Sequence, residues 1–272
     1  NYAVLQPGIM RWTYHINGKL SMSAAVVMED EPVSEVQTAA PEKTVIPLTP
    51  IRKAIADRMV LSKTTIPHAY VTMDIDMTAA LKFRAEFNAG GHGNSEGVRI
   101  SVNDLVMKAA ALALRDVPAV NATFEDGAVV LQPSVNVGVV VAIDGDEGIL
   151  VPVIPDTDKI SIIEMSQQVR AKAEVARKKR LRARDSMGGT FTISNVGMFG
   201  ATYLIAVVQP PQVGILGVGA ITKVPAVDGE QIVIKSVMGV TLSFDHRAVD
   251  GAVAAKFTAA MSALLQTPEK LL

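Results

Sequence analysis

The chain has 272 residues, of which 49% are hydrophobic and 19% charged, and its formal net charge at pH 7 is −1. This composition suits one large or two modest globular domains and excludes disorder over most of the chain. The near-neutral balance gives no electrostatic reason to expect nucleic acid as a partner, because phosphate binding depends on clustered excess Lys and Arg.

The first 45 residues differ in composition from the rest. A weakly alternating stretch is followed by EPVSEVQTAAPEKTV, a sequence rich in Pro, Ala, Glu and Thr that is typical of a linker. We therefore predict a boundary near Val45. Residues 1–45 form an N-terminal extension and linker in this interpretation, either an artificial addition to the chain or a partly disordered segment. Residues 46–272 form the core domain.

The start of the core predicts a helix, a strand and two further helices. PLTPIRKAIADRMVLSK indicates a helix of about three turns, with Thr49 as the N-cap, a proline at the first helical position, and Ile51, Ile55 and Met59 on one face. HAYVTMDIDM alternates like a strand. TAALKFRAEFN and SVNDLVMKAAALALRD predict helices, the second capped by Ser101.

The middle of the chain predicts strands and one long helix. NATFEDGAVVL indicates a hairpin through Asp126 and Gly127, and SVNVGVVVAI and GILVPVI indicate buried strands. The stretch Asp144–Gly148 begins like a calcium loop but lacks the closing glutamate, so a hairpin turn is expected. ISIIEMSQQVRAKAEVARKKRLRA predicts one helix, and its basic run from Arg170 to Asp185 is interpreted as a solvated face rather than a phosphate site.

The last third alternates strands with a closing helix. GTFTISN, VGILGVGAI and QIVIKSVMGVTLSF indicate strands, and GAVAAKFTAAMSALLQ indicates a helix. The spaced glycines of GILGVGA do not indicate a dinucleotide site, because no helix follows to receive a phosphate. The whole pattern predicts an α/β (α+β) fold in which helices cover a central sheet.

Among the four histidines, one has an unusual position. His15, His68 and His92 are interpreted as ordinary surface or edge residues. His246 ends an apolar strand and a helix follows; taken alone, it would be interpreted as a hydrogen-bonded core residue. A neutral imidazole, with a pKa near ~6.5, can take a proton from a thiol of pKa ~8.5 and return it. Asp250 either orients such a site, holds an arginine, or caps the following helix.

Four motifs carry a resemblance over residues 46–272. PLTPIRKAIADRM, GGTFTISNVGMFG, VVQPPQVGILGVGAI and DHRAVDGA, in this order, resemble the catalytic core of the dihydrolipoamide acyltransferases, the E2 components of 2-oxo acid dehydrogenase complexes. The resemblance implies a fold like that of chloramphenicol acetyltransferase, with a central mixed sheet and a trimeric building block. It also implies acyl transfer between a dihydrolipoamide thiol and coenzyme A, with acetyl-CoA as substrate, a lipoyl group on a lipoyl domain not present in this chain, and no metal.

The resemblance also implies three catalytic residues. The histidine and aspartate of the family's DHRxxDG motif fall on His246 and Asp250, and a hydroxyl in its FTI[S/T]N motif falls on Ser194, 52 residues before His246. His246 is expected to act as the base, and Ser194 of a neighbouring chain to donate a hydrogen bond to the developing oxyanion. Without the resemblance, Ser194 would be interpreted as a strand-end hydroxyl. Since the chain has no cysteine, an acyl-cysteine intermediate is excluded.

Two further expectations concern an ion pair behind the site and the end of the chain. Arg52 or Arg58 is expected to pair with Asp250 or Asp245 behind it. At the chain end, Leu271 and Leu272 are expected to be exposed, and in the family such apolar residues dock between trimers.

The acyl group and the assembly follow from the resemblance. The motifs look most like the acetyltransferase of pyruvate dehydrogenase complexes. A branched-chain or other 2-oxo acid acyltransferase, a catalytically idle core component and a free-standing acetyltransferase are the alternatives. The implied partners are copies of the chain, forming homotrimers in an octahedral or icosahedral shell, the lipoyl domain, and the E1 and E3 components through domains missing here. Neither nucleic acid nor a membrane is expected, and the expected compartment is the bacterial cytoplasm or the mitochondrial matrix.

Overall fold

The computed structural model describes residues 9–16, 19–27, 43–94, 97–143 and 148–272. The chain divides into two compact units, Asn1–Pro47 and Leu48–Leu272. In the first unit, β1 (Ile9–Ile16) and β2 (Lys19–Val27) pair as an antiparallel hairpin. The assignment of residues 1–45 as an extension and of residues 46–272 as the core domain stays a prediction. The expected turn at Asp144–Gly148 lies, except for Gly148, outside the described residues.

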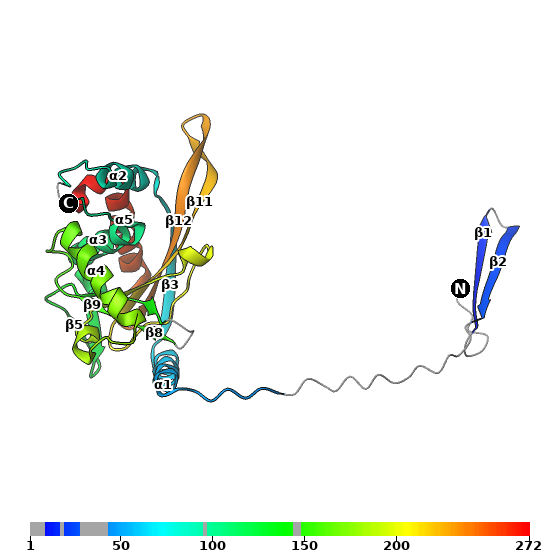
Figure 1. The fold of residues 1–272 in the computed structure, drawn as a ribbon, viewed down its shortest axis with the longest axis horizontal. Coiled ribbons are helices and arrows are strands. Elements are labelled where there is room, and N and C mark those ends of the chain that lie inside the picture. The colour runs from blue at the N-terminus through cyan, green and yellow to red at the C-terminus, as the bar shows by residue number, and fades with distance from the viewer. Residues whose placement is uncertain (1–8, 17–18, 28–42, 95–96, 144–147) are drawn as a thin grey trace. The chain divides into compact units, whose positions relative to one another are not determined.

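The second unit is built on a six-stranded mixed sheet with the order β3-β12-β11-β10-β6-β9 (Figure 1). β10 runs parallel to β11 and to β6, whereas the other neighbours are antiparallel. The strands are β3 (His68–Asp76), β6 (Val137–Val139), β9 (Val153–Ile154), β10 (Phe191–Asn195), β11 (Gly214–Asp228) and β12 (Gln231–Asp245). Two short hairpins accompany them, β4 (Ala122–Glu125) with β5 (Ala128–Leu131), and β7 (Val141–Ala142) with β8 (Ile149–Leu150). The mixed sheet confirms the predicted fold class.

Five α-helices are described around this sheet. They are α1 (Pro50–Thr65), α2 (Thr78–Asn88), α3 (Val102–Asp116), α4 (Ile162–Arg177) and α5 (Gly251–Gln266). The predicted caps are present: the Thr49 side chain accepts from the Arg52 N–H, and Ser101 forms a capping box with Asp104. α1 has 16 residues and is longer than the expected three turns. No helix in the described part of the chain combines the length and the apolar character needed to cross a membrane.

The long helix expected through the basic run ends early. Lys179 adopts a left-handed conformation (φ 55°), its N–H donates to the Ala176 carbonyl, and the next N–H, of Arg180, donates to the Val175 carbonyl. This is the hydrogen-bond pattern that terminates helices. The basic run therefore continues outside α4, where Arg182 pairs with Asp185 at 2.9 Å. The prediction of one solvated helical face is wrong for this part of the run.

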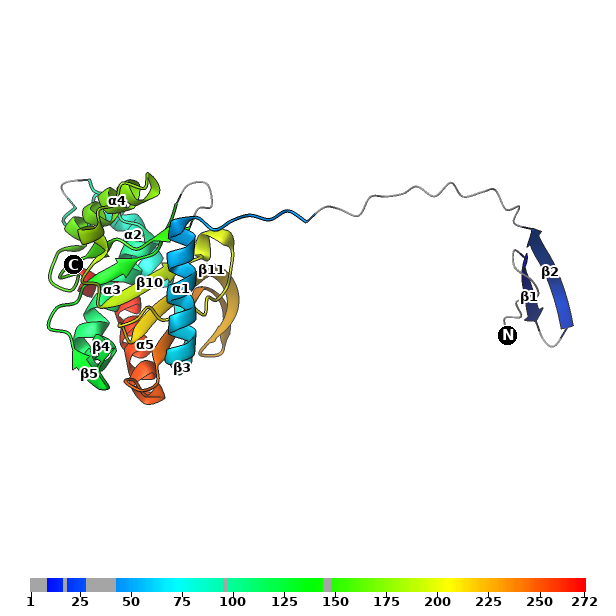
Figure 2. The same cartoon turned by 90° about the horizontal axis from the view of Figure 1, so that it is seen from below.

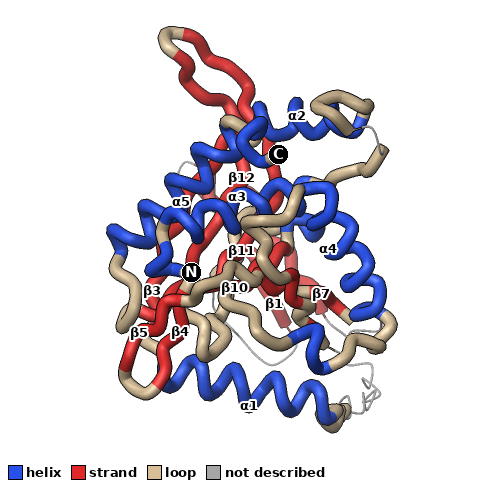
Figure 3. Tube along the Cα trace, turned by 90° about the vertical axis from the view of Figure 1, so that its left-hand side faces the viewer, coloured by secondary structure: helices blue, strands red, loops and turns tan. Residues whose placement is uncertain are grey.

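Helices α2, α3, α4 and α5 pack on one side of the strands (Figures 1 and 3). Strand residues alternate in direction, so every second one faces these helices. On the helix-covered face they are apolar and buried: Phe191, Ile193, Leu216, Val218, Val240, Leu242 and Phe244. The rings of Phe191 and Phe257, from β10 and α5, lie 5.6 Å apart. This face holds most of the hydrophobic core.

The opposite face of the sheet is covered by α1 and by the extended segment Ala201–Val208 (Figure 2). Its central strand residues are mostly small or polar, such as Thr192, Gly217 and Thr241, with Ile215 as an apolar exception. A Cβ atom at Gly217 would lie 2.0 Å from the Leu204 carbonyl oxygen, and one at Gly219 would lie 1.8 Å from that of Thr202. Only glycine permits this approach. The spaced glycines of GILGVGA thus serve backbone packing.

The chain end differs from expectation. Leu271 lies in the short 3-10 helix η4 (Pro268–Leu271) and is fully buried in the core of its own chain, whereas Leu272 is 55% exposed. The prediction of two exposed leucines is therefore wrong for Leu271. η4 turns the chain back after α5 and directs this side chain inward, which the sequence pattern did not indicate.

Candidate active site

His246 directly follows the last residue of β12. Its backbone N–H donates to the Pro67 carbonyl at 3.0 Å, and its ring lies 5.6 Å from the ring of Phe244. The residue is exposed, and neither ring nitrogen has a hydrogen-bond partner among the described residues. Its imidazole is therefore free to exchange a proton with a group from outside the chain.

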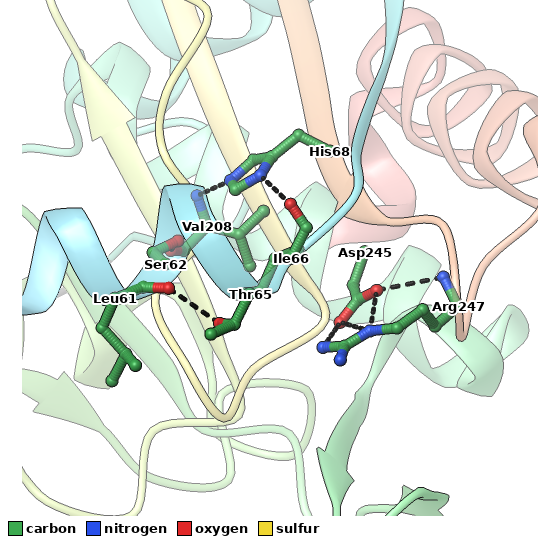
Figure 4. Close-up of polar contacts among 8 residues, drawn as sticks. All are labelled: Leu61, Ser62, Thr65, Ile66, His68, Val208, Asp245 and Arg247. Carbon is green, nitrogen blue, oxygen red and sulfur yellow. Dashed lines mark hydrogen bonds and ion pairs between the residues drawn. The ribbon is translucent and has the colours of Figure 1, made fainter.

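The backbone on both sides of His246 is held by an ion pair between the buried Asp245 and the exposed Arg247 (Figure 4). The Asp245 carboxylate is 1% exposed and accepts hydrogen bonds from the Arg247 backbone N–H at 3.0 Å and from Nη2 at 2.6 Å. These side-chain hydrogen bonds raise the pKa of Arg247 above its ordinary value. The Arg247 guanidinium also lies 3.9 Å from the centre of the Phe124 ring. The turn that carries His246 is thus stabilised by contacts between the two residues that flank this histidine.

The structure pairs Asp245 with Arg247 rather than with Arg52 or Arg58. Arg58 Nη2 instead donates to the Pro210 carbonyl at 2.9 Å. Arg247 is only two residues from Asp245, so bringing the two side chains together costs little loop-closure entropy. The buried charge of Asp245 is therefore neutralised by a residue of its own turn.

Asp250 occupies the N-cap position of α5, with φ −88° and ψ 158°. Its carbonyl accepts from the Ala254 N–H at 2.9 Å, but its side chain makes no capping hydrogen bond. Asp250 is exposed and stands directly before the first residue of α5. Asp250 therefore begins the helix with its backbone and leaves its carboxylate available.

Ser194 lies on β10 and faces the side of the sheet that carries α1. Thr192 and Asn195 on the same strand are engaged: Thr192 Oγ1 donates to Gln212 Oε1 at 2.7 Å, and Asn195 Oδ1 accepts from the Gly197 N–H at 2.8 Å. The half-buried Ser194 hydroxyl has no partner within the described part of the chain. Like His246, it is available to a group from outside.

The strand register separates Ser194 from His246. Ser194 lies opposite Gly217, and Gly217 lies opposite Thr241, which is five residues before His246. With ~3.3 Å per residue along a strand and ~4.8 Å between strands, the two Cα atoms are roughly 15–20 Å apart. One chain does not bring them together, so a site that contains both residues requires two copies.

A cavity of about 650 Å³ lies between α1 and the sheet. Its walls include Ile51, Ile55 and Met59, the three residues predicted to share one face of α1, and the segments 186–190 and 209–212. No group of three His, Asp or Glu side chains within the described ranges is arranged to hold a metal ion. The cavity is large enough for a small organic molecule.

His68 is a residue whose contacts the sequence interpretation missed. It lies opposite Asp245 at the end of the β3–β12 ladder. Its Nδ1 lies 2.9 Å from the Ile66 carbonyl oxygen, and its Nε2 lies 3.1 Å from the Val208 backbone nitrogen (Figure 4). The sequence showed only that this histidine directly follows a proline at the start of a predicted strand; the partners of its ring and the pairing of its strand with β12 came from the structure.

Comparison with known sequences identifies one family. A model described as 2-oxoacid dehydrogenases acyltransferase (catalytic domain) matches residues 40–272. A dihydrolipoyllysine-residue acetyltransferase component of the mitochondrial pyruvate dehydrogenase complex of Arabidopsis thaliana is 43% identical over 84% of this chain and 42% of its own length. The corresponding component of Rickettsia bellii is 38% identical over 85% of this chain and 54% of its own length. The chain thus spans about half the length of the curated relatives it matches.

Solved structures agree in fold. A dihydrolipoamide acetyltransferase of Azotobacter vinelandii superposes with a TM-score of 0.80 at 31% identity, covering 85% of this chain and 94% of that one. The cubic core of a pyruvate dehydrogenase multienzyme complex has a TM-score of 0.80 at 30% identity, covering 90% and 99%. Chloramphenicol acetyltransferase, at 14% identity and a TM-score of 0.50 over 77% and 94%, shares the fold. The expected likeness of fold is confirmed.

Proposed function

Because the chain belongs to the family of 2-oxoacid dehydrogenase acyltransferase catalytic domains, we propose that it transfers an acetyl group between a dihydrolipoamide thiol and coenzyme A. Coenzyme A and the lipoyl group are its substrates, the latter carried on a lipoyl domain outside this sequence. The acetyl group is favoured over branched-chain acyl groups because the similar relatives are named as acetyltransferases of pyruvate dehydrogenase complexes.

One observation carries the assignment of the site. In the Azotobacter enzyme, a serine, a histidine and an asparagine separated by 52 and 4 residues have been investigated for their role in the catalytic mechanism. Ser194, His246 and Asp250 have the same two separations. This chain differs in one respect, since it has aspartate at the third position.

The proposed reaction uses the free groups of two neighbouring copies. His246 of one copy takes the proton from the attacking thiol, and the thiolate forms a bond to the thioester carbonyl carbon. The Ser194 hydroxyl of the next copy donates a hydrogen bond to the carbonyl oxygen as it becomes negative, which is commonly worth ~3 kcal/mol. The tetrahedral intermediate then breaks its other C–S bond, and the leaving thiolate takes the proton back from His246.

Asp250 has a supporting role in this proposal. Asp250 is the fourth residue after His246, at the start of α5, and its carboxylate makes no capping bond. A negative charge near the imidazole stabilises the imidazolium that exists while the intermediate is present. Where the Azotobacter enzyme has a neutral asparagine, this chain supplies a charge.

The assembly follows from the two-copy site. We propose homotrimers, in which each interface supplies His246 from one copy and Ser194 from the next, joined into an octahedral or icosahedral shell. The E1 and E3 components would bind through domains outside this sequence. The proposed compartment is the mitochondrial matrix or the bacterial cytoplasm, the compartments in which such complexes are expected.

The test measures acetyl transfer from acetyl-CoA to dihydrolipoamide and particle mass by light scattering in one preparation. The proposal expects active trimers or larger particles. It also expects His246→Ala to lower the rate at least ~100-fold, because the base that ionises the thiol is removed. His92→Ala is the matched control, since among the described residues the ring of this histidine contacts Phe83 and Glu86 of α2, and it should keep the rate.

Other outcomes separate the alternatives. An assembled particle without transferase activity would indicate an idle core component. Activity with a small hydroxyl acceptor in isolated trimers would indicate a free-standing acetyltransferase. A higher rate with a branched-chain acyl-CoA would overturn the acetyl assignment.

A further inference from the structure

His68 connects two segments that are far apart in the sequence. Its Nδ1 lies 2.9 Å from the Ile66 carbonyl oxygen, which can only accept a hydrogen bond, so Nδ1 carries the proton. Its Nε2 lies 3.1 Å from the Val208 N–H, which can only donate, so Nε2 presents its lone pair. Both ring nitrogens are therefore committed, in one tautomer, to backbone groups. This half-buried histidine is not available as a proton carrier.

The partners of His68 are buried and held from a second side. Ile66 is 6% exposed and Val208 is fully buried, and both pack with Ile215 of β11. The Val208 carbonyl accepts from the Ser62 hydroxyl of α1. The two backbone polar groups of Val208 are thus satisfied by two side chains, His68 and Ser62. The link between α1 and β3 is therefore attached by hydrogen bonds to the extended segment that covers the same face of the sheet as α1.

The residue next to His68 holds the backbone of His246. The β3–β12 ladder ends with the pair His68 and Asp245, and beyond it the His246 N–H donates to the Pro67 carbonyl at 3.0 Å. The His246 imidazole itself has no hydrogen-bond partner among the described residues. Its position therefore depends on its backbone contacts, and the contact with Pro67 depends on the link that His68 fastens.

We propose that His68 is a positioning residue for His246. Its hydrogen bond to Val208 holds the neighbouring Pro67 carbonyl in place, and this carbonyl sets the position from which the His246 imidazole reaches the reacting thiol. This inference rests on the proposed function, because it assigns to His68 an effect on the base of that reaction. A displacement of about 1 Å at a reacting group can cost up to ~100-fold in rate.

Three substitutions separate the two hydrogen bonds. His68→Gln places an amide oxygen near the Nε2 position and can keep the acceptor for Val208. His68→Asn places its amide near the Nδ1 position and can keep only the local bond to Ile66. His68→Phe keeps a ring beside Tyr70, 6.3 Å away, and keeps neither bond. We expect the turnover number of His68→Phe and His68→Asn to fall about 10-fold to 100-fold below that of the unaltered protein. That of His68→Gln should stay within about threefold, and the KM for coenzyme A should be nearly unchanged in all three.

A double-mutant cycle shows whether the effect passes through His246. In a His246→Ala background, His68→Phe should change the residual rate by less than about twofold, because the imidazole to be positioned is absent. Equal losses in both backgrounds would assign His68 a general structural role and overturn the inference. The inference would also be overturned if the turnover number of His68→Gln were no higher than that of His68→Asn. This second comparison can be made even if the His68→Phe variant does not fold.

The single variants distinguish the two proposals. Near-normal turnover in His246→Ala would overturn the proposed base and, with it, the positioning role. A large loss in His246→Ala combined with a normal rate in His68→Phe would overturn the positioning role alone. Particle mass is measured for every variant, so that a loss of assembly is not mistaken for a loss of positioning.

Discussion

The two faces of the six-stranded sheet are covered in different ways. Four helices bury large apolar side chains on one face, where Phe191 contacts Phe257 of α5. On the other face, the segment 201–208 packs closely onto strand glycines, and Ile66, which follows α1, forms a small apolar cluster with Val208 and Ile215. The first face depends on buried volume, and the second depends on close backbone fit and paired polar groups. The free Ser194 hydroxyl belongs to the second face, so the proposed chemistry and the main core occupy opposite sides.

The largest effect is expected on the helix-covered face. Phe257→Ala should lower the free energy of unfolding by about 3–5 kcal/mol, because it removes a fully buried ring and leaves a cavity. Denaturant unfolding at fixed protein concentration measures this loss. Lys256→Ala, one residue earlier on the exposed side of α5, is the control and should change stability by less than about 0.5 kcal/mol. A similar cost at both positions would contradict the division between the faces.

The second-largest effect is expected on catalysis rather than stability. Ser194→Ala should lower kcat about 100-fold to 1000-fold with the coenzyme A KM nearly unchanged, because the hydroxyl is needed when charge develops on the carbonyl oxygen. Thr192→Val is the control on the same strand and face. It breaks the bond to Gln212 and should cost about 1 kcal/mol of stability instead. Weaker binding with an unchanged kcat would make Ser194 a ground-state contact.

A smaller effect on stability is expected where the extended segment touches the sheet. Gly219→Ala should destabilise the protein by about 1–3 kcal/mol, because the added Cβ would lie 1.8 Å from the Thr202 carbonyl oxygen and the segment must shift. Gly251→Ala is the matched control, since no atom lies within 4 Å of a Cβ added there. The midpoints of thermal unfolding of the two variants test this prediction. Equal midpoints would mean that the segment is free to move away from the sheet.

The smallest effect has the opposite sign. The Ser243 hydroxyl is buried on the second face and has no hydrogen-bond partner in the part of the chain that the structure describes, so Ser243→Ala should stabilise the protein by about 1 kcal/mol. Thr241, two residues earlier on the same face, shares a 2.9 Å hydrogen bond with Thr72, so Thr241→Val should destabilise it by about 1 kcal/mol. Unfolding midpoints that move in the same direction in both variants would show that polar pairing does not govern this face.

Local patterns predicted many elements well. α2 and α5 begin and end where the apolar period and the flanking residues indicate, and the hairpin between β4 and β5 turns at Asp126 and Gly127. The end of α4 was missed. Its composition continues to favour a helix through the basic run, but the chain leaves the helix at Lys179. A residue of ordinary helix propensity shows no sign in the sequence that it will adopt a left-handed conformation.

In the candidate site, too, local sequence patterns identified some features and missed others. Ser194, His246 and Asp250 are identified by the motifs in which they occur, and the structure shows each of their side chains free of hydrogen bonds within the described residues. The sequence predicted Ser194 on one strand and His246 at the end of another, but it did not reveal that β11 lies between these strands and that the two residues are far apart in register. The contacts of His68 with Val208, 140 residues away, were also beyond local patterns.

By itself, the sequence determined the elements, the fold class and the residue types able to carry acyl transfer. Caps, turns and hydrophobic periods act over a few residues, so they can be recognised without knowledge of the rest of the chain. Only the tertiary structure decided that Leu271 is buried and that Asp245 pairs with Arg247. It also decided that the glycines of β11 lie in close contact with the backbone of Thr202 and Leu204. These features depend on which distant segments meet and at what register, and that is settled by packing over the whole core rather than by any one stretch of residues.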